Sequence, residues 1–184
     1  TLLSLLNGDH PQAYANEIYL FGRKRGSGES IWDIKEKIGM ISPELHWYFD
    51  MNANVGQTIA SGFFDSMSLY QKLSFDQQKQ LEQILYFFDL KDDKNKKLST
   101  LPLGKQRLAL LARTLIKKPK LLILDEPCQG MDNEQTQYFN QVIDDLANQG
   151  QSLVYVGHFE SQLPKKLSHK LVLENGITRI KEMI

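Results

Sequence analysis

The chain has 184 residues, enough for about one domain with a substantial core, and its 22 basic and 22 acidic residues cancel to a net charge of zero. This balance creates no overall field toward nucleic acid or an anionic membrane, so no nucleic-acid partner is expected. The sequence has no apolar run of the roughly 18–20 residues that a membrane span needs and no visible signal peptide. Its single cysteine, Cys128, cannot form an internal disulfide. These properties predict a cytoplasmic protein.

The first half of the sequence predicts short α/β elements that lead into a helical region. A helix is expected over residues 1–7, and strands are expected over 17–21 and 38–42. The basic, glycine-rich segment 23–30 lacks the Gly-Lys-Ser/Thr ending of a phosphate-binding loop, so it is interpreted as a solvated turn. Residues 49–90 predict a mainly helical region.

Local signals in and after that region are more specific. Ser74 and Gln77 have the spacing of a capping box. An apolar stripe at helical spacing predicts core positions at Leu81, Ile84, Leu85 and Phe88. The charged segment 91–97 contains no apolar residue and therefore predicts a solvated loop.

The second half predicts two buried strands, two helices and a hairpin. The apolar runs 121–124 and 152–156 are typical of strands inside a parallel sheet. A helical pattern covers 108–115, and a second covers 133–148 and ends before Gly150. Residues 171–180 predict a β-hairpin, because Asn175-Gly176 separates two apolar runs.

Asp125 and Glu126 directly follow the first of these buried strands. Two carboxylates at such a position are costly unless something positive meets them. In proteins that hydrolyse nucleotides this partner is Mg²⁺ on a phosphate, and a neighbouring carboxylate orients or deprotonates the attacking water. The alternative is that Asp-Glu-Pro simply begins a solvated loop.

The order of the motifs resembles that of ATP-binding cassette (ABC) ATPases. A glycine-containing helix start at 101–107, the acidic strand end, the loop 129–132 and a strand ending in Gly157-His158 follow one another with the family's spacing. The resemblance implies an α/β fold with a P-loop NTPase-like parallel sheet, truncated at its start, and an inserted helical subdomain. It divides the chain into an α/β core, 1–48 and 101–184, and a helical subdomain of about 49–100.

The resemblance also implies a role for each matching residue in the binding of ATP and Mg²⁺. Asp125 is similar to the Walker B aspartate that holds Mg²⁺ through water, and Glu126 to the catalytic carboxylate that polarises the attacking water. His158 is similar to the switch histidine that contacts the γ-phosphate, with a structural histidine near the sheet edge as the alternative. Asp132 is similar to the loop aspartate that communicates between two facing cassettes.

Two segments depart from the family pattern. Pro43 stands where the family has a glutamine that touches Mg²⁺ and the attacking water, so Ser42 or Glu44 takes over that contact or it is lost. The family signature Leu-Ser-Gly-Gly-Gln is replaced by residues 101–105, Leu-Pro-Leu-Gly-Lys. A site built on this segment is expected to bind ATP yet hydrolyse it poorly. Its candidates for contacting the nucleotide of the opposite cassette are Pro102, Gly104, Lys105 and Gln106.

The first residues resemble the helix that follows a P-loop. This register places Thr1 directly after the Mg²⁺-binding hydroxyl, so the phosphate-cradling glycines and the lysine are expected before residue 1, in a longer protein. On this interpretation the full-length protein is an ATPase and the 184-residue chain by itself is inactive. The alternative is a complete domain that begins with a helix.

The segments 8–14, 21–35, 61–66 and 126–132 narrow the resemblance to the second cassette of the ModF-type proteins, which fuse two cassettes and are named as molybdate-transport ATP-binding proteins. The expected partner is therefore a second cassette, either fused or in a homodimer. Membrane permease subunits are a further option, and they would hold the protein at the inner face of the membrane. Two other functions remain open: a degenerate cassette that binds a partner without turnover, and the energising subunit of an ordinary importer.

Overall fold

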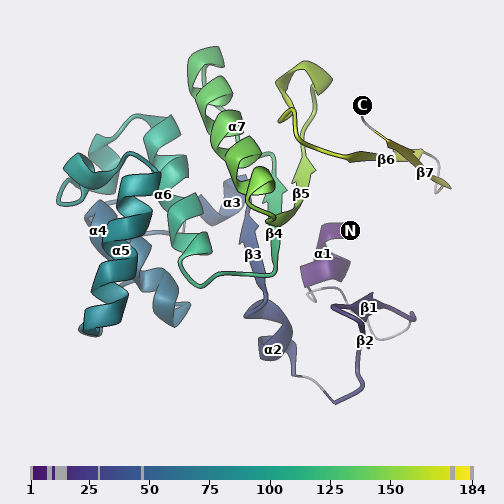
Figure 1. Ribbon diagram of the computed structural model, residues 1–184, viewed down its shortest axis with the longest axis horizontal. Coiled ribbons are helices and arrows are strands. Elements are labelled where there is room, and N and C mark those ends of the chain that lie inside the picture. The colour runs from purple at the N-terminus through teal and green to yellow at the C-terminus, as the bar shows by residue number, and fades with distance from the viewer. Residues whose placement is uncertain are drawn as a thin grey trace.

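The computed structural model describes residues 2–7, 10, 16–28, 30–46, 48–174 and 177–182. Its centre is a three-stranded parallel sheet in the order β3-β4-β5, with helices on both sides (Figure 1). The strands are β3 (Ile38–Ile41), β4 (Leu121–Asp125) and β5 (Ser152–Val156). The parallel pairing confirms the interpretation of the aliphatic runs, because the strands of a parallel sheet are covered on both faces.

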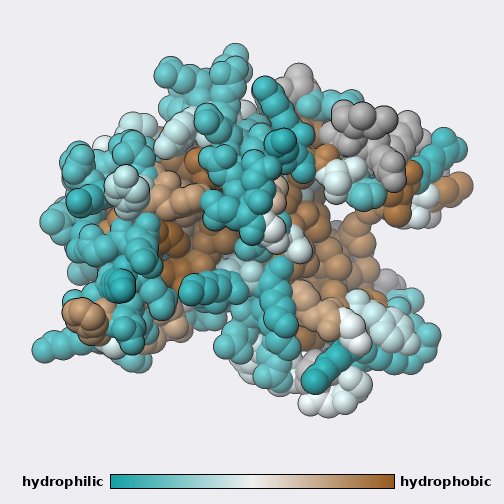
Figure 2. Space-filling model, viewed as in Figure 1, coloured by the Kyte–Doolittle hydropathy of each residue, from teal (hydrophilic) through white to brown (hydrophobic). Residues whose placement is uncertain are grey.

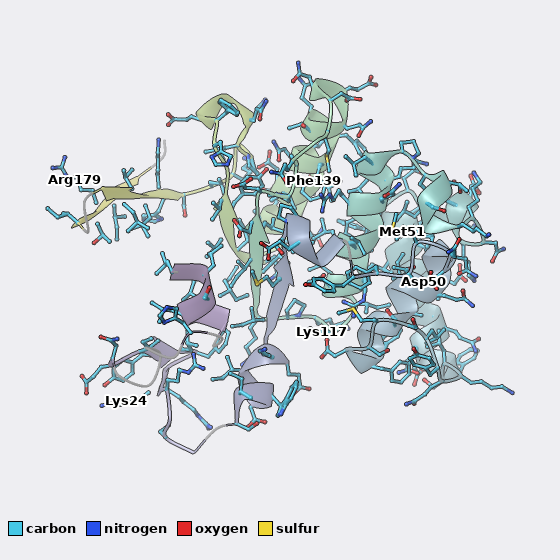
Figure 3. All side chains as sticks on the ribbon, turned by 180° about the vertical axis from the view of Figure 1, so that it is seen from behind. Lys24, Asp50, Met51, Lys117, Phe139 and Arg179 are labelled. Carbon is cyan, nitrogen blue, oxygen red and sulfur yellow. The ribbon has the colours of Figure 1, made fainter. Side chains whose placement is uncertain are left out.

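The central strand β4 directs its side chains into two separate hydrophobic clusters. Leu122 and Leu124 join the larger cluster, to which helices α6 (Leu103–Leu115) and α7 (Asn133–Asn148) also contribute. Phe139 of α7, labelled in Figure 3, is buried in the same cluster. Ile123 belongs to the second cluster, against which Leu3 and Leu6 of α1 (Leu2–Asn7) pack. Both faces of β4 are therefore covered, whereas β5 is only half-buried and not fully buried as expected.

The described elements between β3 and α6 are helices: residues 55–64 contact α6, and residues 75–87 contact residues 55–60 (Figure 1). Two of them, α4 and α5, begin with a capping box, and the box of α5 is the predicted pair Ser74 and Gln77. The predicted stripe on α5 lies in the larger cluster. In chain order, the elements of this region are α4 (Val55–Ala60), η2 (Ser61–Phe64), α5 (Phe75–Phe87), η3 (Lys91–Asp93) and η4 (Leu98–Thr100).

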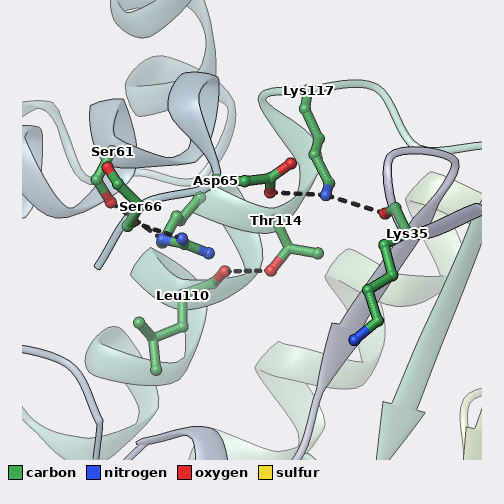
Figure 4. A network of polar contacts seen from close by, with 8 residues as sticks. Lys35, Ser61, Asp65, Ser66, Leu110, Thr114 and Lys117 are labelled. Carbon is green, nitrogen blue, oxygen red and sulfur yellow. Dashed lines mark hydrogen bonds and ion pairs between the residues drawn. The ribbon is translucent and has the colours of Figure 1, made fainter. Parts of the chain in front are cut away.

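Polar contacts just after α6 join this helical region to α2 (Ile31–Lys35), the helix that precedes β3 (Figure 4). Lys117 Nζ donates to Asp65 Oδ1 at 2.7 Å and to the carbonyl oxygen of Lys35 at 3.2 Å. Nearby, a Cβ atom at Gly62 would lie 2.2 Å from the carbonyl oxygen of Arg113, so only glycine permits this close approach of η2 to α6. The helical region is thus fixed against α6 and, through Lys117, against the residues that precede β3.

Each end of the chain carries a small antiparallel hairpin. Near the start, β1 (Tyr19–Leu20) pairs with β2 (Arg23–Lys24); near the end, β6 (His169–Glu174) pairs with β7 (Ile177–Glu182). The second pair confirms the predicted hairpin, although its turn, Asn175-Gly176, lies outside the described residues. Arg179 of this hairpin lies on the side of the molecule away from Asp50 and Met51 of the helical region (Figure 3). Hydrophobic side chains reach the surface between the hairpin and α1 (Figure 2).

The segment that includes β1 and β2 differs from its prediction. The strand expected over 17–21 is limited to two residues, because Phe21 and Gly22 have φ values of +52° and +79° and form the turn into β2. Arg25, expected in a solvated turn, is buried, and its Nη1 donates to the carbonyl oxygen of Leu5 at 3.1 Å. Packing against α1 therefore covers part of this basic segment.

The charged segment 91–97 also differs, since it is not a fully solvated loop. Asp93 is only 4% exposed, because Lys96 and Lys105 both form ion pairs with its carboxylate.

Across the part of the chain that the structure describes, no helix is both long enough and apolar enough to cross a membrane.

Candidate functional site

Three strand ends meet at the carboxyl edge of the parallel sheet. β3 is followed by Pro43, the first residue of the short helix α3 (Pro43–His46), and β4 ends in Asp125 and continues into Glu126. β5 is followed by Gly157 and His158. The registers place Ile41 beside Leu124 and Asp125 beside Val156, so these predicted residues share one edge. In open α/β sheets this edge is the usual position of a ligand site.

Glu126 and His158 contact each other directly. Glu126 Oε1 lies 2.7 Å from His158 Nε2, and Glu126 Oε2 accepts from Gln129 Nε2 at 3.3 Å. The backbone of Glu126 has a φ of +45°, a left-handed conformation that costs a non-glycine residue on the order of 1 kcal/mol. The Glu126 N–H donates to the Val156 carbonyl oxygen at 3.0 Å, which holds this conformation in place. In this conformation the Glu126 side chain lies against His158, the second residue after β5.

Asp125 lies in an environment that disfavours its charge. Burial raises the pKa of its carboxyl group, and the nearby charges of Glu126 and Glu44 raise it further. Among the described residues no group of three or more His, Cys, Asp or Glu side chains is arranged to hold a metal ion. Mg²⁺ does not need such a group, because it is commonly held by one or two carboxylates together with waters and substrate phosphates. The excess negative charge around Asp125 therefore fits Mg²⁺ bound on a nucleotide phosphate.

A second group of predicted residues lies where α7 begins beside the start of α6. Asp132 is the N-cap of α7, and its Oδ1 accepts from the backbone N–H of Gln135 at 2.8 Å. The side chain of Gln135 donates from Nε2 to Asp132 Oδ2 at 2.9 Å, and its Oε1 accepts from the backbone N–H of Gly104 at 2.9 Å. Asp132 and Gly104, predicted from separate motifs, are therefore connected through one side chain.

The other residues of the altered signature make contacts within the chain. Lys105 Nζ lies 2.6 Å from Asp93 Oδ2, and this hydrogen bond raises the pKa of Lys105. Gln106 Nε2 donates to the Leu101 carbonyl oxygen at 2.8 Å. Pro102 is exposed at the N-cap of α6 and provides no side-chain cap. The positive charge of Lys105 is thus paired with a buried carboxylate in this structure.

A cavity of about 230 Å³ separates the loop after β4 from the loop after β5, and Glu126, Cys128 and His158 are among its lining residues. Beside it, the Tyr155 hydroxyl donates to Asn140 Oδ1 at 3.2 Å and lies 3.4 Å from Cys128 Sγ. Burial raises the pKa of both the Cys128 thiol and the Tyr155 hydroxyl. A thiol that stays protonated is a poor nucleophile, so Cys128 acts in packing.

Sequence reasoning missed several residues that contact the predicted ones. Gln129 touches Glu126, Gln135 joins Asp132 to Gly104, and Asp93 pairs with Lys105. A local signal existed for Gln135, which follows Asp132 at the spacing of a capping box. Thr1, predicted to follow the Mg²⁺-binding hydroxyl, lies outside the described residues.

Comparison with known families identifies the class of protein. The model of the family described as ABC transporter matches residues 1–129 of the chain. This match covers more than half of the sequence, so the chain belongs to the ABC transporter family, whose nucleotide-binding domains are ATPases.

Individual relatives agree with this assignment. The chain is 44% identical over 183 residues to the ABC transporter ATP-binding protein ModF of Escherichia coli, and 34% identical over 178 residues to an uncharacterized ABC transporter ATP-binding protein of Schizosaccharomyces pombe. These alignments cover 97% and 96% of the chain but only 37% and 36% of the two relatives. The chain therefore spans little more than a third of the length of either protein.

Solved structures confirm the fold. CbiO1 of Clostridium perfringens, described as part of the ABC transporter complex CbiONQ, superposes with a TM-score of 0.81 at 22% identity, covering 97% of this chain and 69% of that one. The ATP-binding cassette MJ0796, in a dimeric post-hydrolysis state bound to ADP and Pi, superposes with a TM-score of 0.70 at 19% identity, covering 90% and 72%. The superpositions thereby confirm the P-loop NTPase-like α/β fold.

Proposed function

We propose that the chain is the larger part of an ATP-binding cassette and that the full-length protein hydrolyses ATP to ADP and phosphate. The observation that carries this proposal is the contact between Glu126 Oε1 and His158 Nε2 at 2.7 Å. Asp125 precedes Glu126 in the chain, and its carboxylate lies in surroundings whose negative charge favours a bound cation. Phosphoryl transfer to water requires a group that accepts the water proton, a residue that orients this group, and a carboxylate that binds Mg²⁺.

Each of the three residues has a separate task in this proposal. Asp125 holds Mg²⁺ through water, and the ion, when bound, neutralises charge on the phosphates. Glu126 accepts a hydrogen bond from the attacking water and receives its proton. His158 orients Glu126 through Nε2 and contacts the γ-phosphate. Pro43 offers no side-chain oxygen to Mg²⁺ or water, so the carboxylate of Glu44, whose charge already acts on Asp125, replaces the missing contact at the end of β3.

The proposal divides the chain into an α/β core, 1–48 and 101–184, and a helical subdomain of about 49–100. All described elements between α3 and α6 are helices, which supports this division. The similarity to ModF supports a second cassette as the partner, fused or in a homodimer, and the dimeric state of MJ0796 supports a paired arrangement. The similarity to CbiO1, which is part of an ABC transporter complex, supports association with membrane permease subunits at the inner face of the membrane, and the similarity to ModF supports a link to molybdate transport.

A second candidate function is a cassette that binds nucleotide or a partner without turnover. Two observations favour it. Pro102 provides no hydroxyl at the start of α6, and the charge of Lys105 is paired with Asp93. Turnover by the full-length protein distinguishes the two functions.

The test measures ATP binding and phosphate release by the full-length protein and by its Glu126→Gln variant. The variant should keep ATP binding, because Asp125 remains, and lose roughly 10²–10⁴-fold in turnover, the usual contribution of a general base. Glu134→Gln, an exposed neighbour on α7, is the matched control and should leave the rate unchanged. ATP binding with no phosphate release, or with equal release by both proteins, would favour the non-hydrolysing alternative.

A further inference from the structure

The side chain of Gln135 connects the N-cap of α7 to the backbone at the start of α6 by hydrogen bonds. Its Oε1 accepts from the Gly104 N–H at 2.9 Å, while its Nε2 donates to Asp132 Oδ2 at 2.9 Å. The orientation of this amide is dictated by chemistry, because a backbone N–H can only donate and a carboxylate can only accept. The two bonds therefore depend on each other: turning the amide over would break both.

The spacing of Asp132 and Gln135 predicts a different contact. In a capping box the side chain at the third helical position returns to the N-cap backbone N–H. Here it reaches across to α6, against which it also packs, since a Cβ atom at Gly104 would lie 3.1 Å from Gln135 Cβ, Cγ and Oε1. Because Pro102 caps no N–H group with its side chain, Gln135 supplies the missing acceptor from another helix.

We propose that Gln135 is a positioning residue that holds the Gly104 N–H only while the opposite nucleotide is absent, and that it couples Asp132 to the arrival of that nucleotide. This inference rests on the proposed function, in which Gly104 faces the phosphate bound to a second cassette. A phosphate oxygen is a stronger acceptor than a neutral amide because the bond is charge-assisted, so it displaces Gln135 Oε1.

Displacement has a consequence for Asp132. Once Oε1 loses its partner, the amide of Gln135 is no longer restrained from α6, and the bond from its Nε2 to Asp132 is released with it. Asp132 then changes its contacts in response to a nucleotide that it does not touch. Because coupling between two contacts is reciprocal, movement of Asp132 toward the partner cassette in turn favours release of Gly104.

The first test examines the contact itself and needs no nucleotide. Glycine-selective ¹⁵N labelling of the full-length protein allows the amide exchange rate of Gly104 to be followed by NMR. Gln135→Met keeps the size of the side chain but removes both polar atoms, so Gly104 should exchange faster. Gln141→Met, on the exposed face of the same helix, is the control and should leave that rate unchanged. If Gly104 exchanges at the same rate in the Gln135→Met variant and in the unsubstituted protein, Gln135 does not bond to Gly104 in solution.

The second test separates an exchangeable contact from a purely structural cap. Both predict that Gln135→Met lowers the melting temperature. Only the exchangeable contact predicts that the same variant needs less ATP for half-maximal closure of the cassettes, by about two- to tenfold, the effect of one neutral hydrogen bond. Gln135→Glu should shift the ATP requirement the opposite way, because its charge repels both Asp132 and phosphate.

The outcomes distinguish this inference from the function on which it rests. If the unsubstituted full-length protein fails to bind ATP, the proposed function is wrong, and the inference that Gln135 couples Asp132 to the nucleotide is wrong as well. If that protein binds ATP and closes, but Gln135→Met has an unchanged or higher ATP requirement, only the inference about Gln135 is wrong.

Discussion

Lys105 Nζ lies 2.6 Å from Asp93 Oδ2, so the lysine that replaces the signature glutamine is bound to a buried carboxylate of the helical region. Burial by itself would raise the pKa of Asp93. The hydrogen bonds and charges of Lys105 and Lys96 outweigh that effect and hold the pKa below its ordinary value. An unfolded chain protonates this carboxyl near pH 4 and the folded chain at lower pH. The pair therefore stabilises the fold fully above about pH 4, and that stabilisation is lost as the pH falls further.

We expect Asp93→Asn to lower the free energy of unfolding by about 1 kcal/mol at pH 7, a value discounted for the exposure of both lysines. The difference from the unsubstituted protein should shrink as the pH is lowered from about 4 toward 2. Urea unfolding over this pH range measures it. Asp92→Asn, an exposed neighbour, is the control. A loss in Asp93→Asn that stays constant with pH would show that packing, and not charge, is responsible.

The altered signature provides a prediction about turnover. Pro102→Ser with Leu103→Gly should raise the ATPase rate of the full-length protein by roughly 10- to 150-fold, because a hydroxyl bonded to a charged phosphate is worth about 1.5–3 kcal/mol. A serine at this N-cap should also stabilise α6 by about 1 kcal/mol. Adding Lys105→Gln completes the family signature but breaks the pair with Asp93, so the triple variant should be less stable than the double one. Steady-state phosphate release and thermal melting of both variants measure this. The hypothesis of an impaired site fails if neither variant changes turnover or nucleotide-driven closure.

Two arginines of α6 should respond oppositely to the same substitution. Arg107 is buried, and no described residue accepts from its Nε or Nη1; burial also lowers the pKa of its guanidinium. Arg113 is instead satisfied by Ser61 Oγ and the Ser66 carbonyl oxygen, at 3.0 and 2.8 Å. We expect Arg107→Met to raise the melting temperature, since unsatisfied buried donors cost about 1–3 kcal/mol. Arg113→Met should lower it. A lower melting temperature for both variants would mean that Arg107 has an acceptor in solution.

Local patterns predicted the elements well where a single stretch of sequence decides the structure. Helix α7 has its predicted bounds, because its apolar stripe and the stop at Gly150 are local. The solvated loop predicted at Asp93 was wrong and the contact of Gln135 was not predicted, for the same physical reason. The burial of Asp93 depends on Lys105 in a later helix, and the side chain of Gln135 is drawn away from its local cap by Gly104. Contacts between segments distant in the sequence decide where such side chains lie. A rule based on local residue spacing carries no information about these contacts.

The protected thiol of Cys128 makes this chain convenient for site-directed labelling. Cys128 is the only cysteine in the sequence, its side chain is partly buried, and burial raises the pKa of its thiol. Maleimides react with the thiolate, so they should modify this position slowly. A cysteine introduced at an exposed position, such as Gln141→Cys on α7 or Arg179→Cys on β7, would react first. Fluorophore pairs placed in this way can report movements of α7 relative to the C-terminal hairpin, and Cys128 does not have to be replaced.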